Sequence, residues 1–333
     1  MKILIASPVF YPSVGGIETI TDTLAIGISS LGHQVKVITP QVLPSDTNEL
    51  MRNFEILRNP SHLTFLRAIR DCDAFIQNSI SLKNFWPLLV YRRKWIVTHH
   101  GPLFNHSLKL KMIKKLKLFL TRFAVNVGVS KFIGSQFSKK FYVIPNPINL
   151  EFFQIVNTIN KDKDFVFVGR LVKEKGTHLF LEALKCAQII NPSIHATIIG
   201  IGPELENLKK QASSLALNDY VIFKGKLCGE SLIREISRHK VMVIPSIGQE
   251  AFGVVALEGL ACGCNIVATE VGGLPEALDD CGVIVDPENV HALLHGMLKA
   301  SSSVFDNQKV SIHLKKHTSS SIAKSYLQLI NST

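Results

Sequence analysis

Apolar and polar positions along the chain follow two alternating patterns. Short runs that are apolar throughout are typical of strands buried on both faces of a sheet. Longer stretches with apolar residues at every third or fourth position separate them, which is typical of helices packed on a sheet. The order strand, helix, strand runs through the first half of the chain and starts again in the second half. This predicts two sheets of parallel strands, each covered by helices.

The expected elements follow from these runs. In the first half we expect strands at 2–7, 35–39, 54–57, 74–77, 95–98, 124–127 and 142–144, and helices at 17–30, 62–70, 82–91 and 107–123. In the second half we expect strands at 165–168, 196–199, 221–223, 241–244, 265–268 and 283–285, and helices at 175–188, 204–216, 232–237, 254–261, 290–300 and 320–329. The polar stretch 157–164 between the halves predicts a linker that begins near Pro147.

The expected fold class is therefore α/β, with two Rossmann-like, doubly wound parallel-sheet domains and a cleft between them. We expect the first domain at residues 1–149 and the second at 150–319. The last helix, about 320–333, is expected to pack back on the first domain.

Composition places the chain among globular proteins, since 46% of its 333 residues are hydrophobic and 19% are charged. No apolar run approaches the roughly 18–20 residues that span a bilayer. The apolar start resembles a signal peptide, but Pro8 and Pro12 interrupt it, so we expect a buried first strand. The six cysteines form no C-x-x-C pair and are expected to be free thiols.

Charge is spread unevenly along the chain. Residues 1–150 carry 19 Lys and Arg against 7 Asp and Glu, a balance of +12, whereas residues 151–333 carry 18 against 19, a balance of −1. A basic field of this kind attracts phosphate, nucleic acid or an acidic membrane surface.

Ligands of doubly wound sheets bind beyond the carboxyl ends of the strands, so the loops that follow strands are the places to search. The first such loop ends in Gly15 and Gly16, directly before a helix. Glycines let a phosphate approach the backbone closely, and a helix N-terminus attracts anions. The loop is neither G-x-G-x-x-G nor a P-loop, and a plain tight turn is the alternative.

The next candidate loop follows the first strand of the second half and carries Arg170 and Lys175, with Lys175 expected to open the next helix. A guanidinium and an ammonium group that converge at a helix N-terminus suit a diphosphate. The alternative is a run of solvated charges.

Glu250 and Glu258 form the most specific pattern, E-x7-E, after the strand at 241–244. Glu250 is expected in the loop and Glu258 within the following helix, at most about 12 Å away at about 1.5 Å per residue. Glu258 lies on a largely apolar helix, where an ionisable group needs a partner. The alternative is a paired glutamate of the core.

His99 and His100 follow the strand at 95–98, where a histidine beside glycine can line a cleft. For each of them, an ordinary surface histidine is the alternative.

These motifs occur together in a known order. The series G-G-I-E, T-H-H-G, G-R-L-V-K-E-K-G, E-A-F-G-V-V-A-L-E-G-L-A-C-G and G-G-L-P-E resembles glycosyltransferase family four, with the GT-B fold. The resemblance covers nearly the whole chain, and the combination of G-R-x4-K-G with E-x7-E is highly specific. It implies that the first domain binds the acceptor and the second binds a nucleotide sugar.

The resemblance also implies roles for the phosphate-facing residues. Gly15 and Gly16 would face the sugar-phosphate, and Arg170 and Lys175 would neutralise the diphosphate. Charge on the leaving group would then be stabilised by fixed cations and helix N-termini, with no cofactor and no metal.

The sugar contacts implied by the resemblance lie on E-x7-E. Glu250 would hydrogen-bond the transferred sugar, backbone N–H groups of Phe252, Gly253 and Val254 would contact sugar or phosphate, and Glu258 would bind the ribose hydroxyls. His100 fits the family's T-x-H position better than His99, and would lie near the transferred sugar. The histidine doublet leaves this choice open.

Two features depart from the family or bear on the metal. Pro145-Asn146-Pro147 stands where the family has Asn-Gly, which suggests a stiffer hinge, and Cys264-Asn265 replaces the common Thr-Pro. Asp71-Cys72-Asp73 and Asp162-Lys163-Asp164 look like D-x-D, but neither follows a strand, so we expect no metal site.

The activity implied is retaining transfer of a hexose from a nucleotide-diphosphate sugar to a lipid-linked or saccharide acceptor, in cell-envelope polysaccharide or lipopolysaccharide biosynthesis. Front-face attack and a covalent intermediate both remain open. Other readings are a GT-B glycan phosphorylase, a nucleotide-sugar epimerase or a basic nucleic-acid-binding protein. Aromatic residues are not interleaved with the basic run, which argues against nucleic acid as a partner. A dehydrogenase is disfavoured because no G-x-G-x-x-G follows either first strand.

The segment 107–123 is a basic amphipathic helix by its pattern. One face carries Met112, Ile113, Leu116, Phe119, Leu120 and Phe123; the rest carries lysines and Arg122, with Leu110 and Leu118 exposed among them. This predicts shallow insertion into an anionic membrane, with an ordinary surface helix as the alternative. With the basic run 92–94 nearby in sequence, it suggests a polyprenyl-diphosphate or lipid A-linked acceptor. We therefore expect a cytoplasmic protein, peripheral at the inner face of the cytoplasmic membrane.

Overall fold

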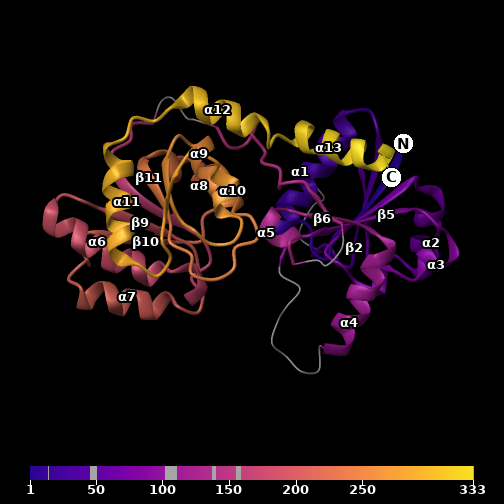
Figure 1. Cartoon of the computed structure of the whole chain (residues 1–333), viewed down its shortest axis with the longest axis horizontal. Coiled ribbons are helices and arrows are strands. Elements are labelled where there is room, and N and C mark those ends of the chain that lie inside the picture. Colours follow the sequence, from indigo (N-terminus) through magenta and orange to yellow (C-terminus); the bar gives the residue numbers. More distant parts are fainter. Residues whose placement is uncertain (14, 46–50, 102–110, 137–139, 155–158, 333) are drawn as a thin grey trace. The chain divides into compact units, whose positions relative to one another are not determined.

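The structure is a computed structural model that describes all residues except 14, 46–50, 102–110, 137–139, 155–158 and 333. The chain divides into two compact units (Figure 1). The first unit consists of Met1–Asn149 with the C-terminal segment from Lys316, and the second of Leu150–Lys315. Each unit is built around its own parallel sheet.

The sheet of the first unit has the order β3-β2-β1-β4-β5-β6-β7, and all its strands are parallel. The strands are β1 (Lys2–Ala6), β2 (Gln34–Thr39), β3 (Glu55–Arg58), β4 (Ala74–Asn78), β5 (Lys94–His99), β6 (Val125–Gly128) and β7 (Tyr142–Val143). Strand order reverses between β1 and β4, so the carboxyl ends of these two strands mark the ligand crevice typical of such sheets.

Helices cover both faces of this sheet. They are α1 (Gly16–Ser30), α2 (His62–Asp71), η1 (Leu82–Asn84), α3 (Pro87–Val90), α4 (Lys111–Leu120), η3 (Thr121–Phe123), α5 (Lys131–Gly134) and the C-terminal α13 (Ser319–Ser332). Helix α13 lies beside α1, and their apolar side chains share one core with β1 and β4. The approach is so close that a Cβ on Gly27 would lie 2.4 Å from the Ser319 carbonyl oxygen. Tyr326 adds a hydroxyl contact of 2.8 Å with Thr98.

The sheet of the second unit has the order β10-β9-β8-β11-β12-β13 and is also parallel throughout. Its strands are β8 (Lys163–Val168), β9 (Ala196–Ile199), β10 (Val221–Gly225), β11 (His239–Ile244), β12 (Asn265–Thr269) and β13 (Val283–Val285). Here the order reverses between β8 and β11.

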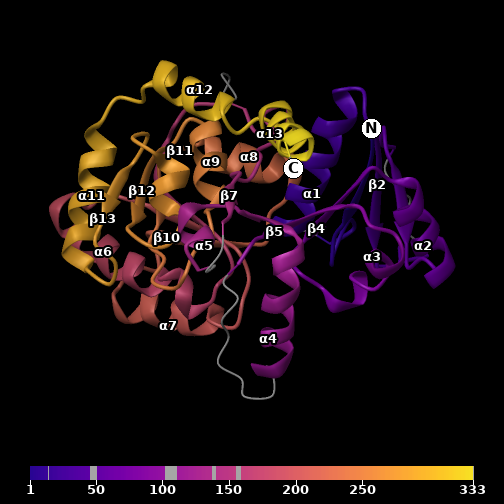
Figure 2. The same cartoon turned by 45° about the vertical axis from the view of Figure 1, so that its right-hand side comes forward.

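The second unit carries helices on both faces of its sheet (Figures 1 and 2). They are η4 (Lys173–Lys175), α6 (Thr177–Ile190), α7 (Leu205–Ser214), α8 (Gly229–Ser237), α9 (Val254–Ala261), α10 (Leu274–Leu278), α11 (Val290–Ser302) and α12 (Asn307–Lys315). Apolar side chains of α6, α7 and α11 form one core cluster on the sheet. Two doubly wound parallel sheets are the fold class that the sequence predicts, and this prediction is confirmed.

Several expected elements of the first unit are wrong in detail. The helix expected at 82–91 is divided into η1 and α3, because Pro87 has no N–H to continue the hydrogen bonds of a helix. The helix expected at 107–123 runs from Lys111 to Leu120 and tightens into η3; residues 107–110 lie outside the described residues.

The second unit also corrects the expectations. The stretch expected to be a linker ends in β8, since Lys163 and Asp164 already belong to that strand, and residues 157–158 lie outside the described residues. Lys175 does not open α6: it ends η4, and Gly176, at a φ of 67°, precedes the first helical residue. Helix α12 has no counterpart among the predictions.

Candidate functional site

The histidine doublet lies at the carboxyl end of β5 and separates into two different environments. His99 is buried, and its Nε2 lies 3.0 Å from Oδ1 of Asn126 on β6. Burial lowers the pKa of His99 to about 4. Asn126 in turn donates to the Thr121 carbonyl at 2.8 Å. His99 therefore links β5 to β6 and to the end of the α4 segment.

His100 is half-buried, with its Nε2 at 3.2 Å from Oδ1 of Asn78, the last residue of β4. The amide nitrogen of Asn78 donates to Thr21 at 2.8 Å, so Oδ1 accepts and Nε2 of His100 carries the proton. The pKa of His100 is lowered to about 4, by burial first and by His99 second, against a contact with Asn146. Nδ1 is buried and has no hydrogen-bond partner among the described residues. At neutral pH this nitrogen is an acceptor.

A polar network continues from Asn78 to the first helix. Thr21 on α1 is fully buried; its hydroxyl donates to the Ile17 carbonyl at 2.7 Å and lies 3.0 Å from the Ser7 hydroxyl, just after β1. The network thus ties the start of α1 to the carboxyl ends of β1 and β4. Ser7, Thr21 and Asn78 were not among the predicted site residues, although Ser7 and Asn78 are polar residues close to the end of apolar runs.

Gly15 and Gly16 stand at the N-terminus of α1, as predicted from their spacing. A Cβ on Gly15 would lie 2.8 Å from Oε2 of Glu18, whereas a Cβ on Gly16 would meet nothing within 4 Å among the described residues. The carboxylate of Glu18 therefore folds back over Gly15. A negative group at this end of a helix competes with a phosphate, so the phosphate role of the two glycines stays a prediction.

Side chains from elsewhere in the first unit hold the loop ahead of these glycines. Gln41 accepts from the backbone N–H of Phe10 at 2.8 Å and donates to the Ser13 hydroxyl at 2.7 Å. The guanidinium of Arg52 lies over the rings of Phe10 and Tyr11, 5.3 and 5.4 Å from their centroids. Val14 lies outside the described residues.

In the second unit, an ion pair joins two of the predicted site residues. Nζ of Lys175, in the loop after β8, donates to Oε2 of Glu250, in the loop after β11, at 2.6 Å. The side chains are 22% and 19% exposed, so solvent screens them only in part. Arg170, on the same loop as Lys175, is exposed, and no ion pair of its guanidinium occurs among the described residues.

Backbone hydrogen bonds hold these loops together. The Glu174 carbonyl accepts from the N–H groups of Ile247 and Gly248 at 2.9 and 3.0 Å. The Glu250 carbonyl accepts from the Gly273 N–H at 2.8 Å. The loops after β8, β11 and β12 are therefore in direct backbone contact.

Glycine is required where the loops touch. A Cβ on Gly176 would lie 1.8 Å from the Pro245 carbonyl oxygen, and one on Gly272 would lie 2.0 Å from that of Glu250. Both residues also have a positive φ, 67° and 59°, which disfavours other residues. The second unit thus brings the motifs G-R-x4-K-G, E-x7-E and G-G-L-P-E together at one edge of its sheet.

Glu258 lies on α9, one turn into the helix, and is half-buried. No hydrogen bond or ion pair of its carboxyl occurs among the described residues, and burial raises its pKa to about 7. From Val254 to Glu258 the helix rises about 6 Å, at about 1.5 Å per residue. The Phe252 ring is buried, so only its backbone can reach a ligand, and Gly253 precedes the helix with a φ of 93°.

Comparisons with known protein families cover almost all of both units. The model for Glycosyltransferase Family 4 matches residues 14–152, and the model for Glycosyl transferases group 1 matches residues 149–312.

The chain belongs to the family-four glycosyltransferases.

Curated relatives match parts of this family-four chain. It is 33% identical over 145 residues to the phosphatidylinositol N-acetylglucosaminyltransferase gpi3 subunit of Schizosaccharomyces pombe, covering 42% of this chain and 31% of that protein. It is also 33% identical over 136 residues to a GDP-mannose-dependent alpha-(1-6)-phosphatidylinositol monomannoside mannosyltransferase of Mycolicibacterium smegmatis, covering 38% and 36%. The matches thus span about a third of the length of these two relatives.

Solved structures share the whole fold. The crystal structure of Anabaena Alr3699/HepE in complex with UDP and glucose superposes with a TM-score of 0.78 over all of both chains, at 17% identity. The predicted GT-B fold and the family resemblance are therefore both confirmed.

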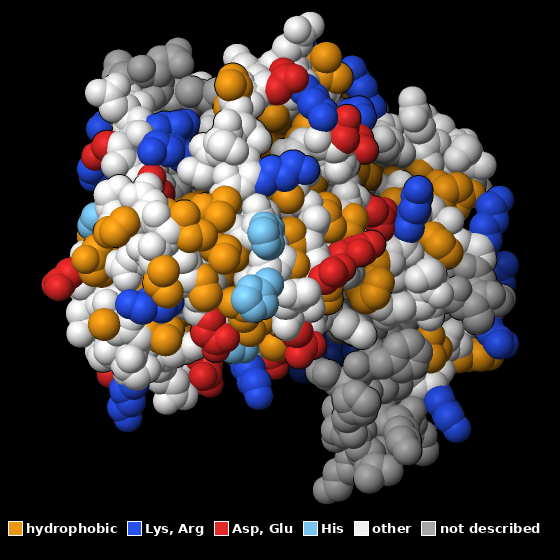
Figure 3. All heavy atoms as spheres, turned by 60° about the vertical axis from the view of Figure 1, so that its left-hand side comes forward, with side chains coloured by type: hydrophobic (Ala, Val, Ile, Leu, Met, Phe, Trp, Pro, Cys, Tyr) orange, Lys and Arg blue, Asp and Glu red, His pale blue; other side chains and the backbone are white. Residues whose placement is uncertain are grey.

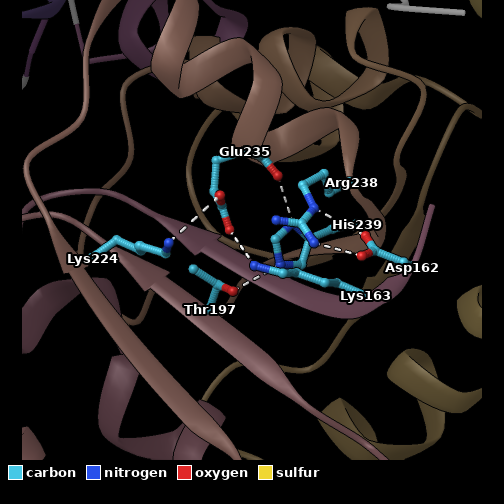
Figure 4. A network of polar contacts seen from close by, with 7 residues as sticks. All are labelled: Asp162, Lys163, Thr197, Lys224, Glu235, Arg238 and His239. Atoms are coloured by element: carbon cyan, nitrogen blue, oxygen red, sulfur yellow. Dashed lines mark hydrogen bonds and ion pairs between the residues drawn. The ribbon is translucent and has the colours of Figure 1, made fainter. Parts of the chain in front are cut away.

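A second charged cluster in this glycosyltransferase is structural (Figure 4). Lys163 donates to Glu235 at 2.5 Å, and both side chains are nearly buried. His239 is fully buried; its Nδ1 lies 2.7 Å from the Glu235 carbonyl and its Nε2 lies 2.9 Å from the Thr197 hydroxyl. Each of these polar groups has a hydrogen-bond partner within the cluster, so the cluster ties α8 to the sheet.

The two D-x-D-like pieces are used in pairing. Asp162 pairs with Arg238 at 2.5 Å, and Asp164 pairs with Lys240 at 3.0 Å. Asp73 accepts from the backbone N–H of Lys2 at 2.7 Å. Within the described ranges, no group of three His, Cys, Asp or Glu is arranged to hold a metal ion.

Two cations of the basic run 92–94 have hydrogen-bond partners within the first unit. Arg93 donates to the carbonyls of Ile69 and Arg70 at the end of α2, and Lys94 donates to the Ile330 carbonyl of α13 at 2.6 Å. These residues lie at the amino end of β5, whereas His100 directly follows the carboxyl end of the same strand. The structure gives no support to the suggestion that this run binds a diphosphate-linked acceptor, because two of its three cations bind carbonyl groups at helix ends.

Helix α4 presents an apolar stripe to solvent, and the expectation that Leu118 is exposed among the basic residues is wrong. Ile113, Leu116, Phe119 and Phe123 are 44%, 47%, 50% and 67% exposed, whereas Leu118 is half-buried. The helix projects from the first unit (Figures 1 and 2). Leu110 and the side chains of 111, 112 and 114 lie outside the described residues.

On the face drawn in Figure 3, acidic and basic side chains are interspersed without a continuous field of either sign. No described helix is long and apolar enough to cross a membrane.

Proposed function

We propose that the protein transfers a hexose from a nucleoside-diphosphate sugar to an acceptor hydroxyl, and that its second unit binds the donor. The observation that carries this proposal is the Lys175–Glu250 pair, which lies with Arg170 at the strand-order reversal of the second sheet. A cation for the diphosphate and a carboxylate for sugar hydroxyls are adjacent there.

The donor contacts follow from the chemistry of each group. Arg170 and Lys175 bind the diphosphate and stabilise the charge that develops on it as the anomeric bond breaks. Backbone N–H groups at the start of α9 add to this field. No metal ion takes part in this scheme, since fixed cations serve the leaving group.

The two glutamates bind hydroxyl groups at opposite ends of the diphosphate. Glu250 accepts from the transferred hexose, and Glu258 accepts from the ribose. A partly buried carboxylate needs hydrogen-bond donors, and the apolar side chains of α9 supply none. Ribose hydroxyls are such donors, which supports the ribose role of Glu258.

His100 serves the transferred sugar from the first unit. Its Nδ1 is a bare acceptor at neutral pH, held in place by the contact of Nε2 with Asn78. A sugar hydroxyl is a matching donor. The proposal includes retention of the anomeric configuration, which an NMR spectrum of the product's anomeric proton checks.

The nucleotide test is a thermal-shift panel of UDP-, GDP- and ADP-sugars, followed by a transfer assay with and without inorganic phosphate. One nucleotide sugar should raise the melting temperature and be consumed without phosphate. Consumption that needs phosphate and no nucleotide would support a phosphorylase instead.

The acceptor is proposed to be lipid-linked or a saccharide of the cell envelope, reached at the inner face of the cytoplasmic membrane. The names of two relatives include phosphatidylinositol or a phosphatidylinositol monomannoside. The exposed stripe on α4, flanked by Lys115, Lys117 and Arg122, suits shallow insertion among anionic lipids.

Liposome flotation tests the membrane proposal. Burying a phenylalanine contributes about 2 kcal/mol, so Phe119→Ser should reduce flotation with anionic vesicles at least about fivefold. Ile312→Ser, a control at a 56% exposed residue of α12, should leave it unchanged. Wild-type flotation that is absent, or equal on neutral vesicles, would contradict the proposal.

A further inference from the structure

The Lys175–Glu250 ion pair joins the two groups that serve opposite parts of the donor. Lys175 is assigned to the diphosphate and Glu250 to the hexose, yet Nζ and Oε2 lie 2.6 Å apart. A diphosphate that takes the ammonium group must displace the carboxylate or share the ammonium with it. Binding of the diphosphate therefore carries an energetic cost that depends on Glu250.

The backbone on both sides of the pair is fixed, so only side chains can respond. The Glu250 carbonyl is bound by Gly273, and the Glu174 carbonyl next to Lys175 is bound by Ile247 and Gly248. At Gly176 and Gly272 the backbones of these loops approach so closely that a Cβ would clash with a carbonyl oxygen of the neighbouring loop. Opening the pair is a rotation of two side chains.

Only a ligand that carries both a diphosphate and a hexose offsets the energetic cost of opening the Lys175–Glu250 pair. A nucleoside diphosphate takes Lys175 from its partner and leaves the Glu250 carboxylate unpaired in a partly buried position. An intact donor also supplies hexose hydroxyls that donate to this carboxylate. The pair thus favours the donor over the nucleoside diphosphate that remains after transfer.

We infer that the Lys175–Glu250 pair is a specificity device that discriminates the intact nucleotide sugar from its spent nucleoside diphosphate and promotes release of the latter. This inference rests on the proposed function. It assigns Glu250 a second task, competition with the product for Lys175, besides its contact with the sugar.

The experiment is a double-mutant cycle of binding constants. UDP, GDP and ADP, each with its glucose conjugate, are titrated calorimetrically into wild type, Glu250→Gln, Lys175→Met and the double variant. Glu250→Gln should bind the preferred nucleoside diphosphate about tenfold more tightly than wild type and the sugar conjugate no more tightly. In the Lys175→Met background, Glu250→Gln should change the affinity for the diphosphate less than twofold, because the competition is gone.

A matched control separates the pair from general charge. Glu270 is exposed and directly follows β12, at the same edge of the sheet. Glu270→Gln removes one negative charge there and should change the affinity less than twofold. Thermal unfolding of each variant confirms that it is folded.

Three outcomes would overturn the inference: no tightening in Glu250→Gln, equal tightening in Glu270→Gln, or full tightening that persists with Lys175→Met. The last two would mean plain charge repulsion. If wild type binds none of the nucleotides or their conjugates, the proposed function itself fails, which is a different result from a failed cycle.

Discussion

The two sheets of the molecule have the same doubly wound design, but their carboxyl edges differ in chemistry. The first unit places neutral, mostly buried groups there: Ser7, Thr21, Asn78 and a neutral His100 form a chain of hydrogen bonds. The second unit places charges there, with Lys175 and Glu250 paired and Arg170 exposed. One edge can recognise hydroxyls, and the other can stabilise an anion. The same fold thus presents two chemically different edges through the residues that follow its strands.

The largest expected effect is on the charged edge. Lys175→Ala removes a cation from the leaving group, and removing one such contact costs about 10²–10³ in turnover. Sugar transfer should therefore fall by at least about a hundredfold, measured as kcat/KM with the nucleotide sugar from the thermal-shift panel. Lys173→Ala is the matched control, since Lys173 is an exposed lysine of the same turn. Comparable losses in both variants would show that general charge, and not the Lys175 contact, is what counts.

On the neutral edge, the two histidines should have different roles: we expect His100 to serve the reaction and His99 to stabilise the fold. His100→Ala should lower kcat about 2- to 10-fold, since a hydrogen bond between a neutral imidazole and a sugar hydroxyl contributes about 0.5–1.5 kcal/mol. His99→Ala should instead lower the free energy of unfolding by about 1–3 kcal/mol, because Asn126 loses a buried partner. Urea unfolding and turnover of the two variants decide this; the reverse pattern would make His99 the site residue.

The neutral edge should also be sensitive to acid. His99 and His100 have pKa values of about 4 in the folded protein, below the ordinary 6.5, so the unfolded chain binds more protons between these values. Their stabilising contribution is complete above about pH 6.5 and is lost as pH falls toward 4. Trp86 and Trp95 are the two tryptophans of the chain, and both lie in the first unit. Their fluorescence should report a lower urea midpoint at pH 5 than at pH 7.

On the charged edge, pH should act through Glu258 with a smaller effect. Its pKa is raised to about 7, and the ionised form is the better acceptor for ribose hydroxyls. Affinity for the nucleotide should therefore rise a few-fold from pH 6 to pH 8, and Glu258→Gln should remove this dependence. A pH dependence that survives in Glu258→Gln would have to arise from another group.

The difference between the edges also explains what the sequence could predict. Arg170, Lys175 and Glu250 are charges in loops that directly follow apolar runs, and Glu258 is a charge on an apolar helix, so their positions could be predicted from the sequence. Asn78 and Thr21 were not found, because a neutral polar residue at a strand end or in a helix has many ordinary structural uses. Backbone contacts between loops, such as Gly272 against Glu250, depend on tertiary structure and leave no signal beyond the glycine itself.

Long-range pairing accounts for the errors. Asp162 and Lys163 read as a polar linker, because their partners Arg238 and Glu235 lie more than 70 positions away in the sequence. The run 92–94 read as an anion site for the same reason: two of its cations bind helix carbonyls that no local pattern reveals.

The most direct test of the central claim is a crystal structure with the nucleotide sugar from the panel bound. We predict the diphosphate within hydrogen-bonding distance of Arg170 and Lys175, the hexose on Glu250 and the ribose hydroxyls on Glu258. A nucleotide bound at the amino edge of the second sheet, with the Lys175–Glu250 pair still closed, would contradict this account.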